Sequence, residues 1–338
     1  MKWNEQCCRQ IDISIIIPVF NCAAYIADCL KSCEIQSFRN FEIIIIDDGS
    51  TDSTKEIIHE CCATMQNKCQ IIELEDNYGV SQCRNIGLNY AKGTYIFFLD
   101  ADDVIRYDAL EKLYNVAMVE NCSVVYSKYR RFNLLSSNIL ECVDKSAVNY
   151  RRIGIHYEEL DARIYAGTIW GGLIKKQIID DNNLRFDTDL KYGEDTIFKL
   201  ELFRYVDCIL EIDDVLYFWR ITPNSLSGTT TFDRSLKRET KLVEKVVSLI
   251  NKEPQSKNYS MLLLHYYRIR KNSVYRLCLD QNIEIKQLEM DSIHLCTQIV
   301  LHAGKVSLCK MLEILYAFFP GLDTWRIQKV IFAVFYRR

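Results

Sequence analysis

Four short apolar runs, separated by stretches of helical composition, are the feature that most constrains the fold of this 338-residue chain. The runs are Ile13–Val19, Phe41–Ile46, Gln70–Leu74 and Thr94–Leu99, and the helical stretches between them are 23–35, 54–65 and 79–92. Runs that are apolar on both faces are typical of parallel strands covered by helices. Right-handed crossovers place the C-terminal ends of such strands at one edge of the sheet. We therefore predict an α/β fold with one crevice, lined by the loops that follow these strands.

The remaining sequence divides into a less regular part and a helical part. Between 131 and 230 the pattern predicts helices at 174–179 and 195–205 and a strand at 215–221. From about residue 232 onward the pattern is almost entirely helical, over 232–251, 257–281, 284–303 and 306–318. We therefore predict two regions, an α/β region at 1–230 and a helical region at 231–338.

Composition excludes several classes of protein. The net charge is -3 and no basic run is interleaved with aromatic residues, which excludes a nucleic acid as partner. The 15 cysteines are scattered without a Cys-x-x-Cys pair, which argues against a zinc site and a disulfide framework and favours free thiols in a reducing cytosol. Met1–Gln10 lacks an apolar signal-peptide core, and no stretch reaches the roughly 18 apolar residues of a spanning helix. We expect a cytoplasmic protein.

An acidic cluster follows the fourth apolar run directly. Asp100, Asp102 and Asp103 would repel one another strongly unless a cation lay between them. The spacing of Asp100 and Asp102 suits a divalent cation, Mn²⁺ or Mg²⁺, that is bound together with a diphosphate. The alternative is a solvated acidic turn that caps the next helix, and this alternative stays open.

Polar residues also follow the other strands. Pro18 and Phe20 offer a rigid edge and a flat face that suit a planar base, although a Pro that simply ends a strand is an equal alternative. Asp47 or Asp48 can accept hydrogen bonds from a base or ribose, whereas a turn with a helix cap does not explain both carboxylates. Arg84 lies just over one turn into a helix whose N-terminus suits an anion, and its alternative is an ion pair with one of these two aspartates.

Two further motifs lie in the second half of the α/β region. Glu194 and Asp195 open a helix, where the macrodipole stabilises carboxylates, and the functional alternative makes one of them a general base. Trp170, beside two glycines, is typical of a sugar platform, although a buried Trp is commoner. The chain has neither Gly-x-Gly-x-x-Gly nor a Walker loop, which disfavours a dinucleotide or ATP enzyme.

Taken together, these motifs resemble family 2 glycosyltransferases of the GT-A fold. The matching stretches, in order, are Ser14–Asn21, Ile46–Asp52, Ser81–Gly87, Gly93–Asp103 and Gly193–Asp195, and they lie within residues 12–220. The resemblance implies a Rossmann-like, mostly parallel sheet between helices. It also implies transfer of a sugar from a nucleotide donor, by resemblance a UDP-sugar, with inversion at the anomeric carbon.

The resemblance also implies roles for single residues. Pro18, Phe20 and Asp48 would border the nucleotide base, with Asn21 in the same nucleotide-binding set. Arg84 would contact the nucleotide. Asp100 would reach the ribose and take part with Asp102 in binding the divalent cation. Asp195 would be the general base, with Glu194 beside it. The resemblance implies nothing about residues beyond 230.

The C-terminal segment Trp325–Arg338 combines aromatic and basic residues. Such a segment suits a membrane interface, which would fit a lipid-linked saccharide acceptor at the inner face of the plasma membrane. The alternative is a helix packed on the catalytic domain. Two rival functions stay open as well: a degenerate nucleotide-sugar-binding scaffold, and a nucleotidyltransferase, which a missing Gly-rich, lysine-containing signature disfavours.

Overall fold

The structure, a computed structural model, describes residues 10–65, 68–133, 148–154 and 168–222, together with eight residues between 238 and 249. The chain divides into two compact units, the first comprising 1–155 and 159–229 and the second 156–158 and 230–338. All strands described below belong to the first unit. The predicted helices at 257–281, 284–303 and 306–318, and the segment Trp325–Arg338, lie outside the described residues.

The first half of this unit is a parallel α/β arrangement, as predicted. Its elements are β1 (Ile13–Val19), α1 (Ile26–Glu34), β2 (Phe41–Asp47), α2 (Thr54–Thr64), β3 (Lys68–Glu73), α3 (Val80–Tyr90) and β4 (Tyr95–Phe98). β1 pairs in parallel with β2 and with β4, and β2 pairs in parallel with β3. The apolar runs are therefore strands buried on both faces, because helices cover each side of the sheet.

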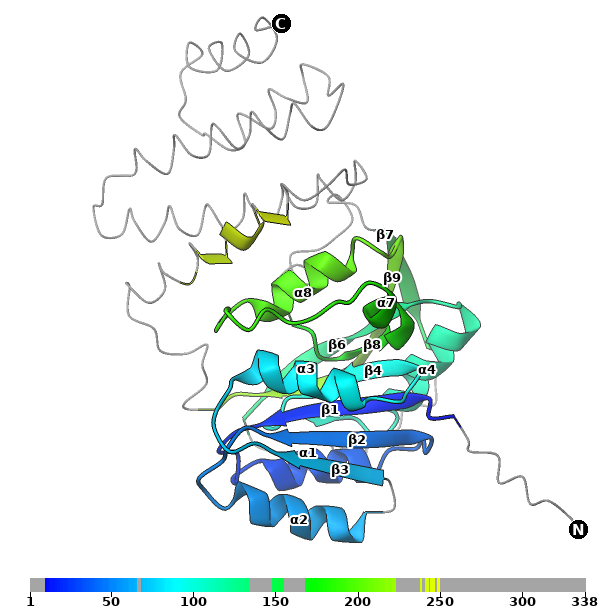
Figure 1. Cartoon of the computed structure of the whole chain (residues 1–338). Helices are drawn as coiled ribbons and strands as arrows, with labels where there is room; N and C mark the ends of the chain where they lie inside the picture. The colour runs from blue at the N-terminus through cyan, green and yellow to red at the C-terminus, as the bar shows by residue number, and fades with distance from the viewer. Residues whose placement is uncertain are drawn as a thin grey trace, which may run out of the picture. The chain divides into compact units, whose positions relative to one another are not determined.

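The second half adds antiparallel strands and gives a mixed sheet. It comprises β5 (Val104–Ile105), α4 (Ala109–Val119), β6 (Val124–Phe132), β7 (Tyr150–Gly154), β8 (Gly172–Lys175), α7 (Lys176–Asp181), α8 (Glu194–Leu202) and β9 (Cys208–Arg220). Within the described residues the strand order is β3-β2-β1-β4-β8-β6-β9-β5, with β7 beside β9 (Figure 1). The predicted α/β architecture, a sheet between helices, is thus confirmed.

One predicted element is partly wrong. The helix expected over 174–179 begins only at Lys176, because Gly172–Lys175 forms strand β8 between β4 and β6. Four residues are too few to show a strand period, and this strand is defined by its two neighbours in the sheet.

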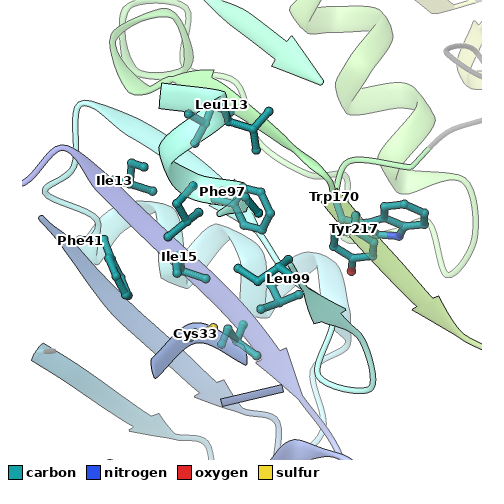
Figure 2. Packing of buried hydrophobic residues seen from close by; sticks show 14 of the residues in the cluster. Ile13, Ile15, Cys33, Phe41, Phe97, Leu99, Leu113, Trp170 and Tyr217 are labelled. Carbon is teal, nitrogen blue, oxygen red and sulfur yellow. The ribbon is translucent and has the colours of Figure 1, made fainter. Parts of the chain in front are cut away.

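Alternate residues of the central strands build two apolar layers. On one face Ile13, Ile15 and Phe97 pack with Cys33 of α1 and Leu113 of α4, and Figure 2 shows this layer. Helices α1 and α4 thus cover this side of the sheet, and this packing buries the apolar face of each helix.

The opposite face carries α3 and α8. A Cβ on Gly87 of α3 would lie 2.4 Å from Cγ2 of Ile16, so this helix lies directly against β1. The ring of Phe98 in β4 makes edge contacts with Phe186 and with Phe198 of α8, at centroid distances of 5.3 and 6.3 Å. α3 and α8 therefore lie on the same face as each other, which places the N-terminus of α8 near α3. None of the helices in the described part of the chain is long and apolar enough to cross a bilayer.

Candidate active site

The loops that follow β1 and β2 are joined by hydrogen bonds at the C-terminal edge of the sheet. The backbone N–H of Asn21 donates to Oγ of Ser50 at 2.9 Å, and its side-chain Oδ1 accepts from the N–H of Thr51 at 2.8 Å. Asn21 has a φ of 47°, a left-handed conformation that Asn tolerates better than most residues. Asn21 therefore fixes the two loops to each other.

Asp48 connects this pair of loops to the loop that precedes α3. Its two carboxylate oxygens accept from the backbone N–H groups of Tyr78, at 2.7 Å, and Gly79, at 2.8 Å. Asp47 is fully buried, and its Oδ2 accepts from the N–H of Ser50 and lies 3.6 Å from Nζ of Lys55. Asp48 thus holds the loop before α3, whereas Asp47 holds the turn at Ser50 and faces Lys55.

Two aromatic rings are exposed at this edge. Phe20, directly after β1, is 47% exposed, and Tyr78, before α3, is 58% exposed. Both rings therefore lie in solvent beside the polar loop cluster. Pro18, within β1, is partly buried and does not share this exposure.

Arg84 of α3 is buried and joins three carboxylates from two distant parts of the chain. Its Nη2 donates to Oδ1 of Asp100 at 3.0 Å, and its Nη1 donates to Oε1 of Glu194 at 3.1 Å and to Oδ1 of Asp195 at 2.5 Å. The guanidinium is 3% exposed. Its ion-pair partners are these three residues, and the pairing with an aspartate of the β2 loop that the sequence left open is not seen in the described residues. The guanidinium of Arg84 therefore brings together three site residues that were predicted from separate motifs.

Glu194 and Asp195 form the first turn of α8, after Gly193, whose φ of 78° places it in the left-handed region. Oδ2 of Asp195 also accepts from the backbone N–H of Ile169 at 3.4 Å. Burial raises the pKa of Asp195 well above its ordinary value, and the neighbouring guanidinium of Arg84 opposes this shift. A largely buried carboxylate with a raised pKa suits proton transfer.

The acidic cluster is a turn between β4 and β5, here named the carboxylate turn (Asp100–Asp103). Burial, with the nearby charge of Asp100, raises the pKa of Asp102 to about 6. Burial also raises the pKa of Asp103 to about 9, and the charges of Asp100 and Asp102 add to this shift. The mutual repulsion predicted from the sequence is therefore present in the folded turn.

The carboxylate turn fits a cation that is shared with a substrate. Among the described residues, no group of three or more His, Cys, Asp and Glu side chains is arranged to hold a metal ion. Mg²⁺ and Mn²⁺ are often bound through one or two carboxylates, with phosphate oxygens and water as the other ligands. Asp100 and Asp102 match that donor set, and a cation there would relieve the repulsion that Arg84 and Arg220 offset only in part.

Sequence reasoning missed two residues that contact this turn. Tyr217 and Arg220 of β9 hydrogen-bond to the carboxylate turn. Trp170 is buried at 6% exposure and stacks on Tyr217, so the commoner alternative of a buried Trp is correct and the platform interpretation is wrong. The run of three aromatic residues Tyr217–Trp219 was the available signal for this cluster.

Comparisons with known proteins agree with this geometry. Residues 14–175 match the glycosyl transferase family 2 sequence profile. The chain is 31% identical over 229 residues to the glycosyltransferase GlyA of Streptococcus pneumoniae, covering 65% of this chain but 32% of GlyA. It is 29% identical to GlyG of the same organism, covering 67% of this chain and 76% of GlyG. The chain thus spans about a third of one of these relatives and about three quarters of the other.

Solved structures with the same fold are more distant in sequence. A fragment of S. aureus TarS in complex with UDP-GlcNAc superposes with a TM-score of 0.68 at 18% identity, over 95% of this chain and 88% of that one. The Pyrobaculum calidifontis mannosyltransferase PcManGT, in complex with GDP-Man and Mn²⁺, gives 0.57 at 15% identity, over 95% and 84%. At such low identity these structures establish the fold alone. The profile match and the curated relatives together show a glycosyltransferase family 2 domain in this chain, over residues 14–175.

Proposed function

We propose that this chain transfers a sugar, with inversion, from a nucleoside-diphosphate sugar to a hydroxyl group of a glycan or lipid-linked acceptor. The observation that carries the proposal is the Arg84 network, because one guanidinium holds both Asp100 of the carboxylate turn and Asp195 of α8. A donor-binding carboxylate and a candidate base are thereby fixed on the same side of the sheet. Family membership supports the reaction type, and relatives with similar sequences include the poly(ribitol-phosphate) beta-glucosyltransferase of Bacillus spizizenii.

The loops after β1 and β2 are the proposed site for the nucleotide base and ribose. Phe20 supplies an exposed ring, and Asn21 and Asp48 hold the surrounding loops in place. Pro18 would border the base from within β1, and Asp100 would accept from a ribose hydroxyl. We favour UDP as the nucleotide, since the TarS fragment, bound to UDP-GlcNAc, superposes more closely than the GDP-Man complex does.

Asp102, with Asp100, would hold a divalent cation against the donor diphosphate. When bound there, the cation would supply positive charge to the leaving nucleoside diphosphate. The protein's own part is to keep two carboxylates close despite their repulsion, and Arg84 does so for Asp100 with a 3.0 Å hydrogen bond. We propose that Arg84 acts on the nucleotide through this carboxylate, because its guanidinium is buried.

Asp195 is the proposed general base. The acceptor oxygen forms a bond to the anomeric carbon, the bond from that carbon to the diphosphate oxygen breaks, and the acceptor proton goes to Asp195. Inversion needs only one such base on the face opposite the leaving group. Burial of Asp195 raises its pKa, which increases its affinity for the proton, and the bonds from Arg84 and Ile169 orient its carboxylate. Glu194 shares the same guanidinium and would assist that orientation.

The substitution Asp195→Asn tests this assignment. We expect the variant to bind UDP in the presence of Mn²⁺ as tightly as the wild type and to lose transfer by about 10²–10⁴-fold, the usual contribution of a general base. The assay is UDP release from a panel of UDP-sugars with saccharide acceptors, alongside calorimetric UDP binding. Glu194→Gln is the matched control and should keep more activity. Transfer at the wild-type rate in Asp195→Asn would remove the base assignment.

The two rival functions give different results in the same assays. A nucleotide-sugar-binding scaffold would bind UDP and turn over no donor. A nucleotidyltransferase would release pyrophosphate from a nucleoside triphosphate. The proposed contact of Trp325–Arg338 with a membrane interface is separate, and co-flotation of the full chain with anionic vesicles tests it.

A further inference from the structure

The carboxylate turn is supported from β9, a strand more than a hundred residues further along the chain. β5, which follows the turn directly, pairs antiparallel with β9, with Val104 opposite Phe218 and Ile105 opposite Tyr217. The turn itself is closed by a hydrogen bond from the N–H of Asp103 to the carbonyl of Asp100, at 3.1 Å. The end of β9 therefore lies directly beside the turn.

Tyr217 of β9 bonds to both ends of the turn. Its hydroxyl accepts from the backbone N–H of Asp100 at 3.3 Å and donates to Oδ2 of Asp103 at 2.6 Å. Its ring is fully buried and stacks on Trp170 with a centroid distance of 4.2 Å and an interplanar angle of 9°. Figure 2 shows the two rings side by side. A ring held in this way leaves its hydroxyl little freedom to follow a displaced turn.

Arg220, three residues later, holds the same turn at two further points. Its backbone N–H donates to Oδ1 of Asp103 at 2.7 Å, and its Nε donates to the carbonyl oxygen of Asp102 at 2.7 Å. Its Nη2 pairs with Asp28 at 2.9 Å, and its guanidinium lies over the ring of Phe132 at 4.7 Å. Both oxygens of Asp103 are thus bonded within the protein, which leaves Asp100 and Asp102 as the carboxylates available to a ligand.

We propose that Tyr217 and Arg220 are positioning residues that set the direction in which the carboxylates of Asp100 and Asp102 face the donor diphosphate and its cation. The inference rests on the proposed function, since it needs those two carboxylates to bind a metal nucleotide. It assigns Asp103 to the support of the turn and not to the ligand. Neither Tyr217 nor Arg220 touches the substrate in this arrangement.

The substitution Tyr217→Phe removes the hydroxyl and keeps the ring on Trp170. Calorimetry then gives the UDP affinity with and without Mn²⁺. We expect the affinity in Mn²⁺ to fall about tenfold, as the loss of a hydrogen bond to a charged group would give, and the metal-free affinity to change less than about twofold. The control is Tyr95→Phe, another buried tyrosine of this sheet, whose hydroxyl donates to the carbonyl of Cys122 at 3.2 Å, away from the turn.

A second variant, Arg220→Lys, keeps a positive charge near Asp28 but cannot reproduce the Nε contact to the carbonyl of Asp102, and it should show the same selective loss. Equal affinities in Mn²⁺ for Tyr217→Phe and wild type would overturn the inference, as would a parallel loss in the Tyr95→Phe control. If wild type itself gains nothing from Mn²⁺, the proposed metal site fails and this inference fails with it. The wild-type titration thus separates the two failures.

Discussion

Replacement of Arg84 by Met is the perturbation whose effect the structure predicts most sharply. The side chain of Met nearly fills the space but leaves Asp100, Glu194 and Asp195 without their shared cation. The three carboxylate side chains are 30%, 12% and 14% exposed, so water replaces the guanidinium only in part. Removing one partner of a buried ion pair costs about 3–5 kcal/mol, and we expect a loss of that size for Arg84→Met.

Such a loss is a large fraction of the stability of a domain. Typical unfolding free energies are about 5–15 kcal/mol, and in a domain of this size each kcal/mol shifts Tm by about 2–4 °C. Urea unfolding followed by tryptophan fluorescence reports mainly on the first unit, because three of the four tryptophans belong to it and only Trp325 belongs to the second. Arg151→Met is the control, since that side chain is 51% exposed and its pair with Glu211 should contribute less than about 1 kcal/mol.

The pH dependence of the loss gives an independent check. In the wild type the charge of Arg84 opposes the rise in the pKa of Asp195. Without the guanidinium, folded Asp195 binds its proton more tightly, so acidification stabilises the variant relative to the wild type. The loss in Arg84→Met should therefore shrink between about pH 7.5 and about pH 5. A loss below about 1 kcal/mol, or one that is independent of pH, would refute the reasoning that these three partly buried carboxylates depend on Arg84.

Three further predictions concern single residues. Burial lowers the pKa of Lys199 from 10.5 to about 8, so between pH 8 and pH 10.5 the unfolded chain binds this proton more tightly than the folded chain. The stability of wild type relative to Lys199→Met should therefore rise by up to about 3 kcal/mol as the pH increases across that window. A pH-independent stability difference in urea titrations would contradict this. Gly93→Ala places a Cβ 2.4 Å from the backbone N of Ser14, so chemical unfolding should show a cost of about 1–3 kcal/mol or more, whereas an unchanged midpoint would contradict the close approach. Asp48→Asn places an amide NH₂ group opposite one of the two backbone N–H donors, those of Tyr78 and Gly79, so one hydrogen bond is lost. Metal-free UDP affinity should therefore fall about tenfold. An affinity equal to that of the wild type would contradict the role of Asp48 in holding the loop before α3.

The first half of the fold could be predicted because its signals are local. Each strand from β1 to β4 contains an apolar run, and each has a Pro or an acidic residue within two positions of its C-terminal end: Pro18, Asp47, Glu73 and Asp100. Each helix between them has its own composition. The loops at the strand ends followed from topology, since parallel strands connected by right-handed crossovers end at one edge. The prediction that Asn21, Asp48 and Asp100 lie at that edge needs only this rule and no knowledge of long-range contacts.

The remaining features depend on contacts between distant residues. Arg84 pairs with Glu194 and Asp195, which lie 110 and 111 positions away, and no local pattern selects them over the aspartates of the β2 loop. β8 is a strand because β4 and β6 lie on either side of it. Tyr217 reaches Asp103 across 114 positions through the pairing of β5 with β9. Sequence periodicity reports burial but does not report which buried partner a side chain will meet.

The central claim is that the C-terminal edge of this sheet binds a metal-chelated nucleoside diphosphate through the carboxylate turn. Calorimetric titration of the full chain with UDP, with and without Mn²⁺ and with GDP as the comparison nucleotide, tests it most directly. The account predicts that Mn²⁺ strengthens UDP binding, that GDP binds more weakly, and that Asp102→Ala abolishes the Mn²⁺ effect. Absence of binding by either nucleotide, or an undiminished Mn²⁺ effect in Asp102→Ala, would contradict it.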